Sequence, residues 1–492
     1  MWRATNAESA LQITTIADET RLALANLIDR TTGIAVPSVR LGVTGVARAG
    51  KTVFITALIH NLIHGGRLPV FKAYSSGRIS GAALEPQPDD DVPRFDYEDH
   101  VRALVDERIW PESTRRISEI RLTIRYESAS FLARTLGRGA LHLDIVDYPG
   151  EWLLDLPLLS KDFATWSAEA VSLSKAAARA EFSAAWRARL QAIDPNAPED
   201  EGTARELAGL FSAYLHAARA AGGSLSTVPP GRFLMPGDLD GSPALTFSPL
   251  DLGGRAIAPG SLAAMMARRY EAYKSAVVRP FFRDHFARLD RQIVLVDVLA
   301  ALNAGSEAVA ELETALAEVL AAFRVGRSGW LTGLVSRRIE RILFAATKAD
   351  HLHHSDHDRL EAILARLVAR AVERARFAGA RVEVIALASV RATREGTVAS
   401  GNDRLASIIG TPLPGETVNG RVFDGSSEIA MFPGDLPDDP ESLFQRTDSR
   451  AALRFLRFRP PKLERTAEGL TLSLPHIRLD RALEFLIGDR LS

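Results

Sequence analysis

Apolar positions along the chain follow two spacings, and the two spacings alternate. Apolar runs predict strands at residues 291–299, 341–350 and 381–389, and apolar residues at Val39, Leu41 and Val43 predict a short strand at 39–43. Positions at helical spacing follow these runs from Val53 to Leu62, as far as about Phe323, and from His353 to Ala378. Strands that alternate with helices indicate an α/β fold built on a mostly parallel sheet.

Two further apolar runs lie between the first helix and the later strands. They are "ISEIRLTIRY" at 117–126 and "ALHLDIVDYPG" at 140–150, and they predict two strands that pair as a hairpin. Residues 63–113 have weak periodicity and an acidic stretch, so we expect a long loop with short helices there.

Helical spacing without strands marks two other parts of the chain. Residues 158–222 are rich in Ala and helical throughout, and residues 262–289 return to this pattern after a loop dense in Gly and Pro. Near the start, residues 6–30 predict an amphipathic helix. We expect its apolar side to pack on the core, and binding to a membrane surface is the alternative.

The alternation stops after Val390. Residues 391–472 mix turns and charges with short strand-like pieces at 452–458 and 470–474. The chain then closes on a helix at 478–491, so we expect a mixed β/α region at this end.

Composition narrows the function classes. The chain has 492 residues, 46% of them hydrophobic, which is enough for two or three domains with real cores. Its 60 basic and 61 acidic residues nearly cancel, so no nucleic-acid partner is expected. The absence of Cys excludes disulfides, zinc–thiolate sites and Cys nucleophiles. Without a signal-peptide pattern or an apolar run of about 18 residues, a cytoplasmic protein is expected.

The first chemical motif is "GVARAGKT" at 45–52, which fits the pattern G-x-x-x-x-G-K-[ST] between a strand and a helix. Backbone N–H groups of such a loop cradle phosphates, the Lys reaches the β- and γ-phosphates, and the hydroxyl binds Mg²⁺. The helix N-terminus adds positive partial charge beneath them. The expected phosphate-binding residues are Gly45, Ala47, Arg48, Ala49, Gly50, Lys51, Thr52 and Val53. Arg48 either offers its charge to the phosphates or points to solvent.

The second motif is Asp147-Tyr148-Pro149-Gly150, a D-x-x-G at the end of an apolar strand. In GTPases this Asp acts through water on Mg²⁺, and the Gly N–H responds to the γ-phosphate. The alternative is an ordinary turn at the end of a strand, which Asp and Gly both favour.

The third motif is Thr347-Lys348-Ala349-Asp350, which fits [NT]-K-x-D at another strand end. The carboxylate of Asp350 can accept both N–H donors of guanine, and adenine presents no such pair. The alternative for Asp350 is a cap on the next helix. Ser389 and Val390 follow the last strand of the alternation, where a backbone N–H can reach guanine O6.

Two catalytic positions are harder to assign. Thr114, just upstream of the strand at 117–126, is our candidate for a mobile Thr that closes on Mg²⁺ and the γ-phosphate, with Ser113 and Ser118 as rivals. Glu151 stands where a Gln orients the attacking water in Ras-like proteins. A carboxylate there would repel the γ-phosphate, so an exposed surface acid is the alternative.

Taken together, these stretches resemble the YcjX-like family of bacterial P-loop proteins. The resemblance rests on "GVARAGKTVFITALIHNLI", "WPESTRRISEIRLTIRY", "DIVDYPGEWLLDLPLL", "PPGRFLMPGDLDGSPALTFSPL", "RRYEAYKSAVVRPFFRDHFARLDRQIVLVDVLAALNAG", "FAATKADHLHH" and "LPHIRLDRALEFLIGDRL", and covers nearly the whole chain. It implies a Ras-like G domain with a helical insertion and a C-terminal β-containing region. It also implies GTP binding and hydrolysis, and a link to the phage-shock envelope-stress response.

The fold class expected is therefore α/β, a P-loop NTPase with a Ras-like G domain around a mostly parallel sheet. The parts expected are an N-terminal helix (1–36), the G domain (37–157 and 291–390), a large helical insertion (158–290) and a C-terminal mixed β/α region (391–492).

The function expected is that of a switch that hydrolyses GTP to GDP with Mg²⁺ bound by Thr52, Thr114 and Asp147. Lys51, Thr114 and Glu151 are the expected catalytic residues. An ATPase, or an interaction module that binds nucleotide with little turnover, are the alternatives. The expected partners are a guanine nucleotide and an unidentified protein effector, with membrane-associated stress proteins and peripheral attachment to the inner membrane compatible with the family link.

Overall fold

The computed structural model describes residues 36–45, 48–112, 116–128, 139–221, 229–236, 239, 242–284, 288–322, 339–400, 403–418, 420–444, 455–463 and 473–492. The helix expected at 6–30 lies outside these residues. Within them, no helix is long and apolar enough to cross a membrane.

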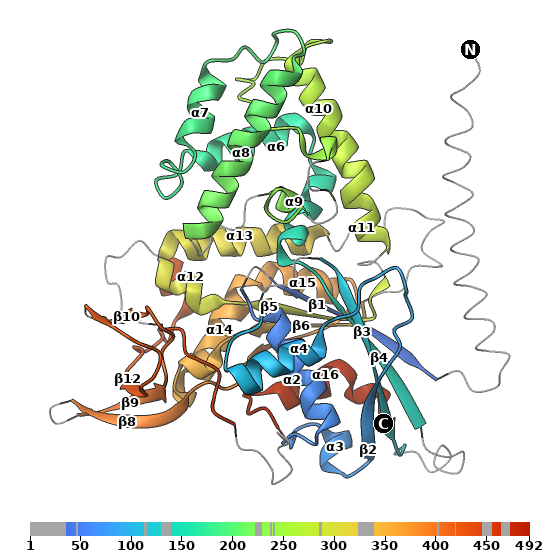
Figure 1. Ribbon diagram of the computed structural model, residues 1–492, viewed down its shortest axis with the longest axis vertical. Helices are drawn as coiled ribbons and strands as arrows, with labels where there is room; N and C mark the ends of the chain where they lie inside the picture. Colours follow the sequence, from blue (N-terminus) through green and yellow to red (C-terminus); the bar gives the residue numbers. More distant parts are fainter. Residues whose placement is uncertain are drawn as a thin grey trace.

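A central sheet of seven strands organises the molecule (Figure 1), in the order β2-β3-β4-β1-β5-β6-β7. Its strands are β1 (Ser38–Gly45), β2 (Ile79–Glu85), β3 (Ser118–Tyr126), β4 (Gly139–Asp147), β5 (Arg291–Val296), β6 (Arg341–Ala346) and β7 (Arg381–Ala386). The five strands from β4 to β7 in this order run parallel. The other two, β2 and β3, pair antiparallel. The α/β class and the pairing of β3 with β4 are confirmed.

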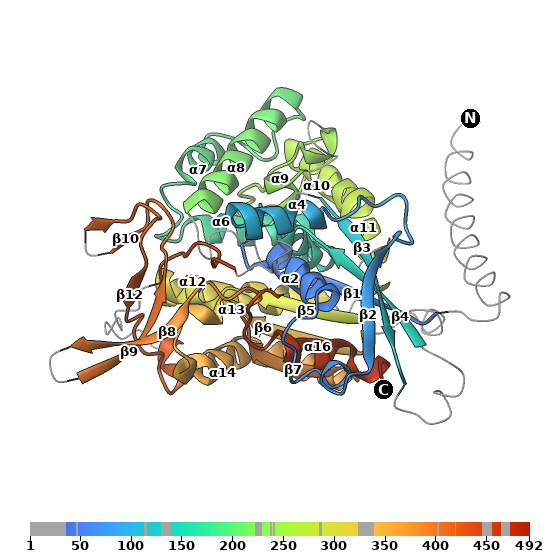
Figure 2. The same ribbon diagram turned by 60° about the horizontal axis from the view of Figure 1, so that its bottom comes forward.

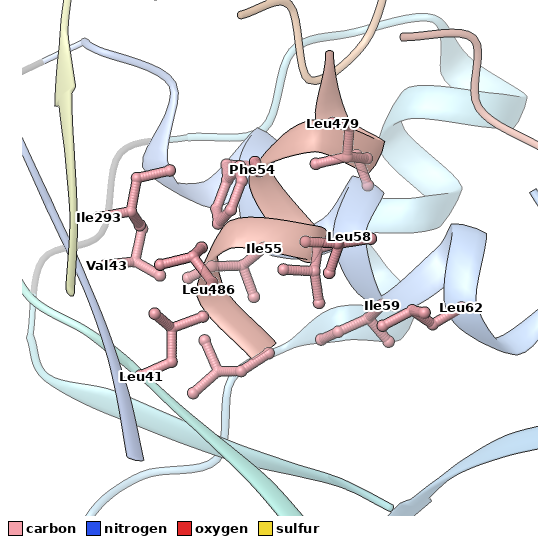
Figure 3. Close-up of a cluster of buried hydrophobic side chains, with 14 of the residues drawn as sticks. Leu41, Val43, Phe54, Ile55, Leu58, Ile59, Leu62, Ile293, Leu479 and Leu486 are labelled. Carbon is pink, nitrogen blue, oxygen red and sulfur yellow. The ribbon is translucent and has the colours of Figure 1, made fainter. Parts of the chain in front are cut away.

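Alternate strand residues build a core on each face of the sheet, because successive side chains of a strand point to opposite sides. On one face, Ile293 and Leu343 join the helices α2 (Lys51–Ile63) and α16 (Leu479–Ile487). Figure 3 shows Leu479 and Leu486 of α16 beside Phe54, Ile55 and Leu58 of α2, over strand residues Leu41, Val43 and Ile293.

The opposite face is covered by helices from the second half of the chain. These are α12 (Val298–Ala304), α13 (Ser306–Ala322), α14 (His357–Leu367) and α15 (Ala369–Phe377), and they pack on Val294 and Phe344. The last helix of the chain, α16, therefore belongs to the sheet's own core, although it follows the C-terminal region in sequence.

The helical insertion forms a separate cluster above the sheet (Figures 1 and 2). It contains α6 (Phe163–Ser174), α7 (Ala184–Gln191), α8 (Glu201–Ala221), α9 (Gly231–Leu234), α10 (Leu262–Tyr273), a π-helical turn (Lys274–Val278) and α11 (Arg279–Asp284). Stacked and edge-on aromatic rings fill it, with Trp166 4.9 Å from Tyr270 and Trp186 5.0 Å from Phe211 between ring centroids. The 3₁₀ segment η2 (Gly150–Ser160) joins this cluster to the end of β4.

The C-terminal region projects from one side of the sheet in both ribbon views. Its three-stranded sheet has the order β12-β9-β8, with β8 at Arg394–Ser400, β9 at Asp403–Gly410 and β12 at Ile429–Met431. A small hairpin pairs β10 (Thr417–Val418) with β11 (Arg421–Val422). A small apolar cluster around Ile408, Leu456 and Phe458 supports it.

Three local predictions were only partly right. The short helices expected at 63–113 are present as α3 (Lys72–Ser75), α4 (Tyr97–Arg102) and a π-helical turn (Ala103–Glu107), but the edge strand β2 in this stretch was not predicted. In the C-terminal region the described strands lie between residues 394 and 431, and the described part of 452–458 makes only an isolated bridge from Phe458 to Pro412. The described part of 158–222 is mainly helical, as predicted, but turns separate α6, α7 and α8.

Candidate functional site

Five parallel strands end at one edge of the sheet, and the sequence motifs follow those ends. Gly45 and Asp147 close β1 and β4, Asp297 and Thr347 follow β5 and β6, and Ser389 comes soon after β7. Because the carboxyl ends of parallel strands meet at the same edge, the three motifs lie along one edge of the sheet. Open α/β sheets bind their ligands at this edge.

The loop between β1 and α2 has the form of a phosphate cradle. A side chain at Gly45 would place its Cβ 2.3 Å from the carbonyl oxygen of Leu295, so only Gly fits there. Gly50 has a left-handed backbone (φ 86°) and precedes α2 without any side-chain cap. Because glycine has no side chain, the N-cap residue does not cover the N-terminus of α2 with a hydrogen-bonding group. An anion site at a helix N-terminus requires this. Arg48 is exposed and Ala49 is buried, while Ala47 lies outside the described residues.

Lys51 begins α2 and is buried, with its Nζ donating to the carbonyl oxygen of Gly45 at 3.1 Å. Burial lowers the pKa of Lys51, because a buried ammonium loses its hydration. The carboxylates of Glu151 and Asp147 oppose this shift, and the guanidinium of Arg219 adds to it. Negative phosphate oxygens at this position would stabilise the charged form of Lys51.

Thr52 and Asp147 supply the oxygen ligands that Mg²⁺ prefers. Both are buried, Asp147 at the end of β4 and Thr52 in the first turn of α2. The hydroxyl of Thr52 lies 3.5 Å from the carbonyl oxygen of Glu112, so the segment that leads to the expected mobile Thr runs beside it. Thr114 and Ser113 themselves lie outside the described residues. Ser118 begins β3 directly opposite Asp147.

Glu151 is not an exposed surface acid, so that alternative was wrong. Its side chain is 4% exposed and forms an ion pair of 2.7 Å with Arg219 of α8. Its main chain packs closely against α9. A Cβ added to Gly231 would lie only 1.7 Å from the carbonyl oxygen of Glu151. Gly150 begins η2, so the D-x-x-G motif leads directly into the contact with the insertion.

Arg219 is a site residue that sequence reasoning missed. It lies on a long amphipathic helix, where an Arg ordinarily belongs to a solvated face, and nothing in its local sequence links it to Glu151. Asp297 was also missed, although its place at the end of β5 is the same signal that marks Asp147 and Thr347.

At the other end of the edge, Asp350 is buried and does not cap a helix. One carboxylate oxygen accepts from the N–H of Ala392 at 2.8 Å, and the hydroxyl of Thr393 donates to its carbonyl oxygen. The next long helix, α14, instead begins after Asp356. The reading of Asp350 as a helix cap was therefore wrong.

The neighbours of Asp350 are held by the ends of adjacent strands. Thr347 donates from its N–H to the carbonyl oxygen of Val296 at 2.9 Å, and Lys348 has a left-handed backbone (φ 61°). The ammonium of Lys348 forms an ion pair with Asp297. His357 supports the same loop through a contact of 2.9 Å to the carbonyl oxygen of Ala349.

Ser389 and Val390 lie in a loop that the C-terminal chain covers. Ala388 and Ile477 exchange two backbone hydrogen bonds of 3.1 and 2.8 Å, and the N–H of Arg391 donates to Pro475 at 2.6 Å. The N–H of Ala349 donates to Leu387 at 3.1 Å, which joins this loop to the one that carries Asp350. The two segments expected to read the base are thus in contact.

Known proteins are similar to this chain over most of its length. The model of the YcjX-like family matches residues 39–491. The chain is 38% identical over 465 residues to a protein of Escherichia coli (strain K12) named "Ras-like GTPase YcjX", covering 92% of this chain and 96% of that protein. It is 34% identical over 473 residues to a protein of Shewanella oneidensis with the same name, covering 92% of this chain and 94% of that one.

Proposed function

This chain belongs to the YcjX-like family, and we propose that it binds GTP with Mg²⁺ and hydrolyses it to GDP and phosphate. The observation that carries the proposal is the meeting of three motifs along one sheet edge. The phosphate loop, the Asp147–Gly150 turn and the Thr347–Asp350 loop all follow the ends of parallel strands. The names of two relatives, both called Ras-like GTPases, support the same activity.

At the phosphate end, each residue has a distinct part. The backbone of the loop and the start of α2 hold the phosphates, and Lys51 contacts the β- and γ-phosphates. Thr52 and Asp147 would hold Mg²⁺, Asp147 through water, and Thr114 would be a further ligand. The ion would supply positive charge that neutralises the phosphate oxygens. Gly150 senses the γ-phosphate through its N–H.

At the base end, Asp350 selects guanine. The N–H of Ala392 holds one of its oxygens, which fixes the direction of the carboxylate before any base arrives. A carboxylate accepts from two parallel N–H groups, as guanine N1 and N2 present them, and charge makes such bonds roughly twice as strong as neutral ones. Lys348 covers the base, and the backbone at Ser389 and Val390 reaches guanine O6.

The same geometry supports a nucleotide-dependent switch that the insertion reports. The segment after Gly150 is buried in the core of the insertion, where Asp155 accepts from the N–H of Gly231 and the hydroxyl of Tyr273, each at 2.7 Å. Movement of Gly150 towards a γ-phosphate therefore has to move the insertion or break these bonds. We further propose that this switch acts in the cytoplasm, in the envelope-stress response and through a protein effector, and the resemblance to the YcjX-like family supports the stress-response part.

A nucleotide-binding interaction module with little turnover is the second candidate function. The ion pair of Glu151 with Arg219 favours it, because a carboxylate engaged in this way does not orient water. Measured turnover with saturating Mg²⁺ and GTP separates the two candidates.

The decisive experiment measures the affinity of the protein for GTP, ATP and XTP by calorimetric titration, before and after Asp350→Asn. The wild type should prefer GTP to ATP by a wide margin. The Asn amide can donate to the extra carbonyl of xanthine and no longer pairs with guanine, so GTP affinity should fall at least about tenfold and XTP affinity should rise.

Asp358→Asn is the matched control, since Asp358 lies nearby on α14 with its side chain 90% exposed. It should leave all three affinities unchanged. If the wild type binds ATP as tightly as GTP, and Asp350→Asn leaves the ratio of GTP to XTP affinity unmoved, the guanine assignment is wrong and the ATPase alternative replaces it.

A further inference from the structure

The ion pair between Glu151 and Arg219 brings a cation of the helical insertion to the phosphate end of the site. Glu151 follows directly on Gly150 of the D-x-x-G motif, and Arg219 lies near the end of α8. Their charged atoms are 2.7 Å apart, with Glu151 almost fully buried. Arg219 also donates to the carbonyl oxygen of Leu234 at 3.4 Å, so the insertion fixes the direction of its side chain.

Arg219 is close enough to Lys51 for the two charges to interact. The guanidinium of Arg219 lowers the pKa of Lys51, while Glu151 and Asp147 raise it. Two cations and two carboxylates therefore gather beside the phosphate loop, and their formal charges cancel. When a phosphate chain and its metal ion bind, the interactions among these four charged groups have to change.

The γ-phosphate of GTP would change which partner Arg219 prefers. Its oxygens repel the carboxylate of Glu151, which is held near them by the Gly150 turn. They attract the guanidinium, whose planar fork fits two phosphate oxygens as well as it fits a carboxylate. Glu151 thus stands where a phosphate group would compete for the same Arg.

We propose that Arg219, carried by the helical insertion, contacts the γ-phosphate during hydrolysis, and that Glu151 holds its side chain at the site between turnovers. This proposal rests on the GTPase function proposed above. It makes the insertion a part of the active site and gives Glu151 a holding function instead of the water-orienting one.

The chemistry requires no proton transfer by Arg219. An oxygen of water forms a bond to the γ-phosphorus, and the bond to the bridging oxygen breaks with its electron pair left on GDP. The proton of the water ends on the released phosphate. Negative charge on the γ-phosphoryl oxygens and the bridging oxygen is greatest near the transition state, where a guanidinium within contact distance stabilises it.

The test compares Arg219→Ala and Arg219→Lys with Arg205→Ala as the matched control. Arg205 lies on the same helix with its side chain 74% exposed, and it forms an ion pair with Glu201. The measurements are the single-turnover rate of GTP hydrolysis, the dissociation constant of GDP, and the gain in GDP affinity on adding aluminium fluoride, which imitates the transferring phosphoryl group.

Arg219→Ala should lower the hydrolysis rate about 10³-fold, the lower end of the effect known for such an Arg. It should also abolish the gain from aluminium fluoride, while GDP affinity stays within about twofold, because GDP has no γ-phosphate to lose the contact. Arg219→Lys should fall between the wild type and Ala, since an ammonium keeps the charge without the fork. Arg205→Ala should match the wild type in all three measurements.

An Arg219→Ala protein that folds and hydrolyses GTP within about threefold of the wild-type rate would overturn the proposal and reduce the ion pair to a structural contact. If Arg219→Ala does not fold, Arg219→Lys decides, since it can keep the pair with Glu151. A full rate and a full gain from aluminium fluoride in Arg219→Lys would then overturn it. A wild type without any hydrolysis would overturn the GTPase function itself, which is a distinguishable result.

Discussion

The helical insertion and the C-terminal region approach different ends of the candidate site, and they hold it by different means. The insertion uses buried side chains. Asp155 is enclosed between Gly231 and Tyr273, and Arg232 lies over the ring of Trp152 at 3.2 Å from its centroid. All of these contacts converge on the segment that follows the D-x-x-G motif.

The C-terminal region holds the base end mainly through the backbone. Two backbone bonds between Ala388 and Ile477, and a bond from the N–H of Ala392 to the carboxylate of Asp350, fix the loop. The side-chain contact of His354 with Glu395 lies at the surface, with the His 67% exposed. Surface pairs of this kind contribute little to stability.

The difference teaches which part of the molecule can report the nucleotide. In the proposed function a γ-phosphate would act at Gly150, and the segment that follows Gly150 shares a core with the insertion. The base end would meet the same guanine in GTP and GDP, so a rigid backbone frame would suit it. We therefore expect nucleotide state to reach the insertion, while the C-terminal region keeps the base loop in place.

The largest effect is expected at the phosphate end of the site, from Lys51→Ala. Loss of the charged contacts to two phosphates should lower the affinity for GTP and GDP by about 100-fold or more, measured by calorimetric titration, since each charged hydrogen bond is worth roughly 1.5–3 kcal/mol. Lys72→Ala is the control, because its side chain is 82% exposed and pairs with Glu484 at 3.6 Å. Unchanged nucleotide affinity in a folded Lys51→Ala protein would remove the phosphate-loop assignment.

A smaller effect is expected from Gly231→Ala, which should push the insertion away from the segment after Gly150. The new Cβ would lie 1.7 Å from the carbonyl oxygen of Glu151, and a backbone atom cannot turn away. We expect a loss of unfolding free energy of about 3 kcal/mol, the upper end for overpacking, measured by chemical denaturation.

Substitutions at two other glycines serve as comparisons for Gly231→Ala. Gly410→Ala in the C-terminal sheet meets only side-chain atoms, the nearest at 2.8 Å on Phe458, and should cost less because a side chain can shift. Gly209→Ala on α8 meets nothing within 4 Å and should be neutral or slightly stabilising, as Ala favours a helix. Equal losses for Gly231→Ala and Gly410→Ala would contradict the distinction between the two regions.

Much of the central sheet could be predicted from the sequence, because strands buried on both faces are continuous apolar runs. The parallel strands β5 and β6 appear this way. β1 shows apolar residues at alternate positions, and the edge strand β7 is exposed or half-buried over its first four residues. The edge strand β2 could not be predicted, since "ISGAALE" has only exposed and half-buried positions. The strands β8 and β9 carry charged residues and form a thin sheet with a small core, so no apolar run marks them.

The site divides in the same way. Residues at strand ends could be predicted, because the fold class fixes where those ends meet, and Asp147 and Asp350 both lie on that edge. The environment of Glu151 could not be predicted, because its burial comes from an insertion far along the chain. Arg219 could not be predicted for the same reason. It meets Glu151 through a contact between segments far apart in the chain, and its neighbours in the sequence do not indicate that contact.

The smallest expected effect is a pH dependence at the insertion end, due to Asp155. Burial raises the pKa of Asp155 from 3.8 to about 6, although its hydrogen bonds with Tyr273 and Gly231 oppose the shift. Between about pH 4 and pH 6 the folded protein therefore keeps a proton on Asp155 that the unfolded chain has lost. Stability from this group is fully present below the unfolded pKa, and it is lost as pH rises through the folded pKa.

At about 1.4 kcal/mol per pKa unit, the free energy of unfolding should fall by at most roughly 3 kcal/mol across this window and then level off. Other groups titrate in the same range, so the informative quantity is the difference between the wild type and Asp155→Asn, which cannot ionise at this position. That difference, from denaturation series at pH 4.5 and pH 7.5, should move in favour of Asp155→Asn as pH rises. A stability difference that stays constant with pH would mean that Asp155 is ionised in the folded protein throughout this range. The insertion end would then tolerate a buried charge as readily as the C-terminal region tolerates its charged surface pair.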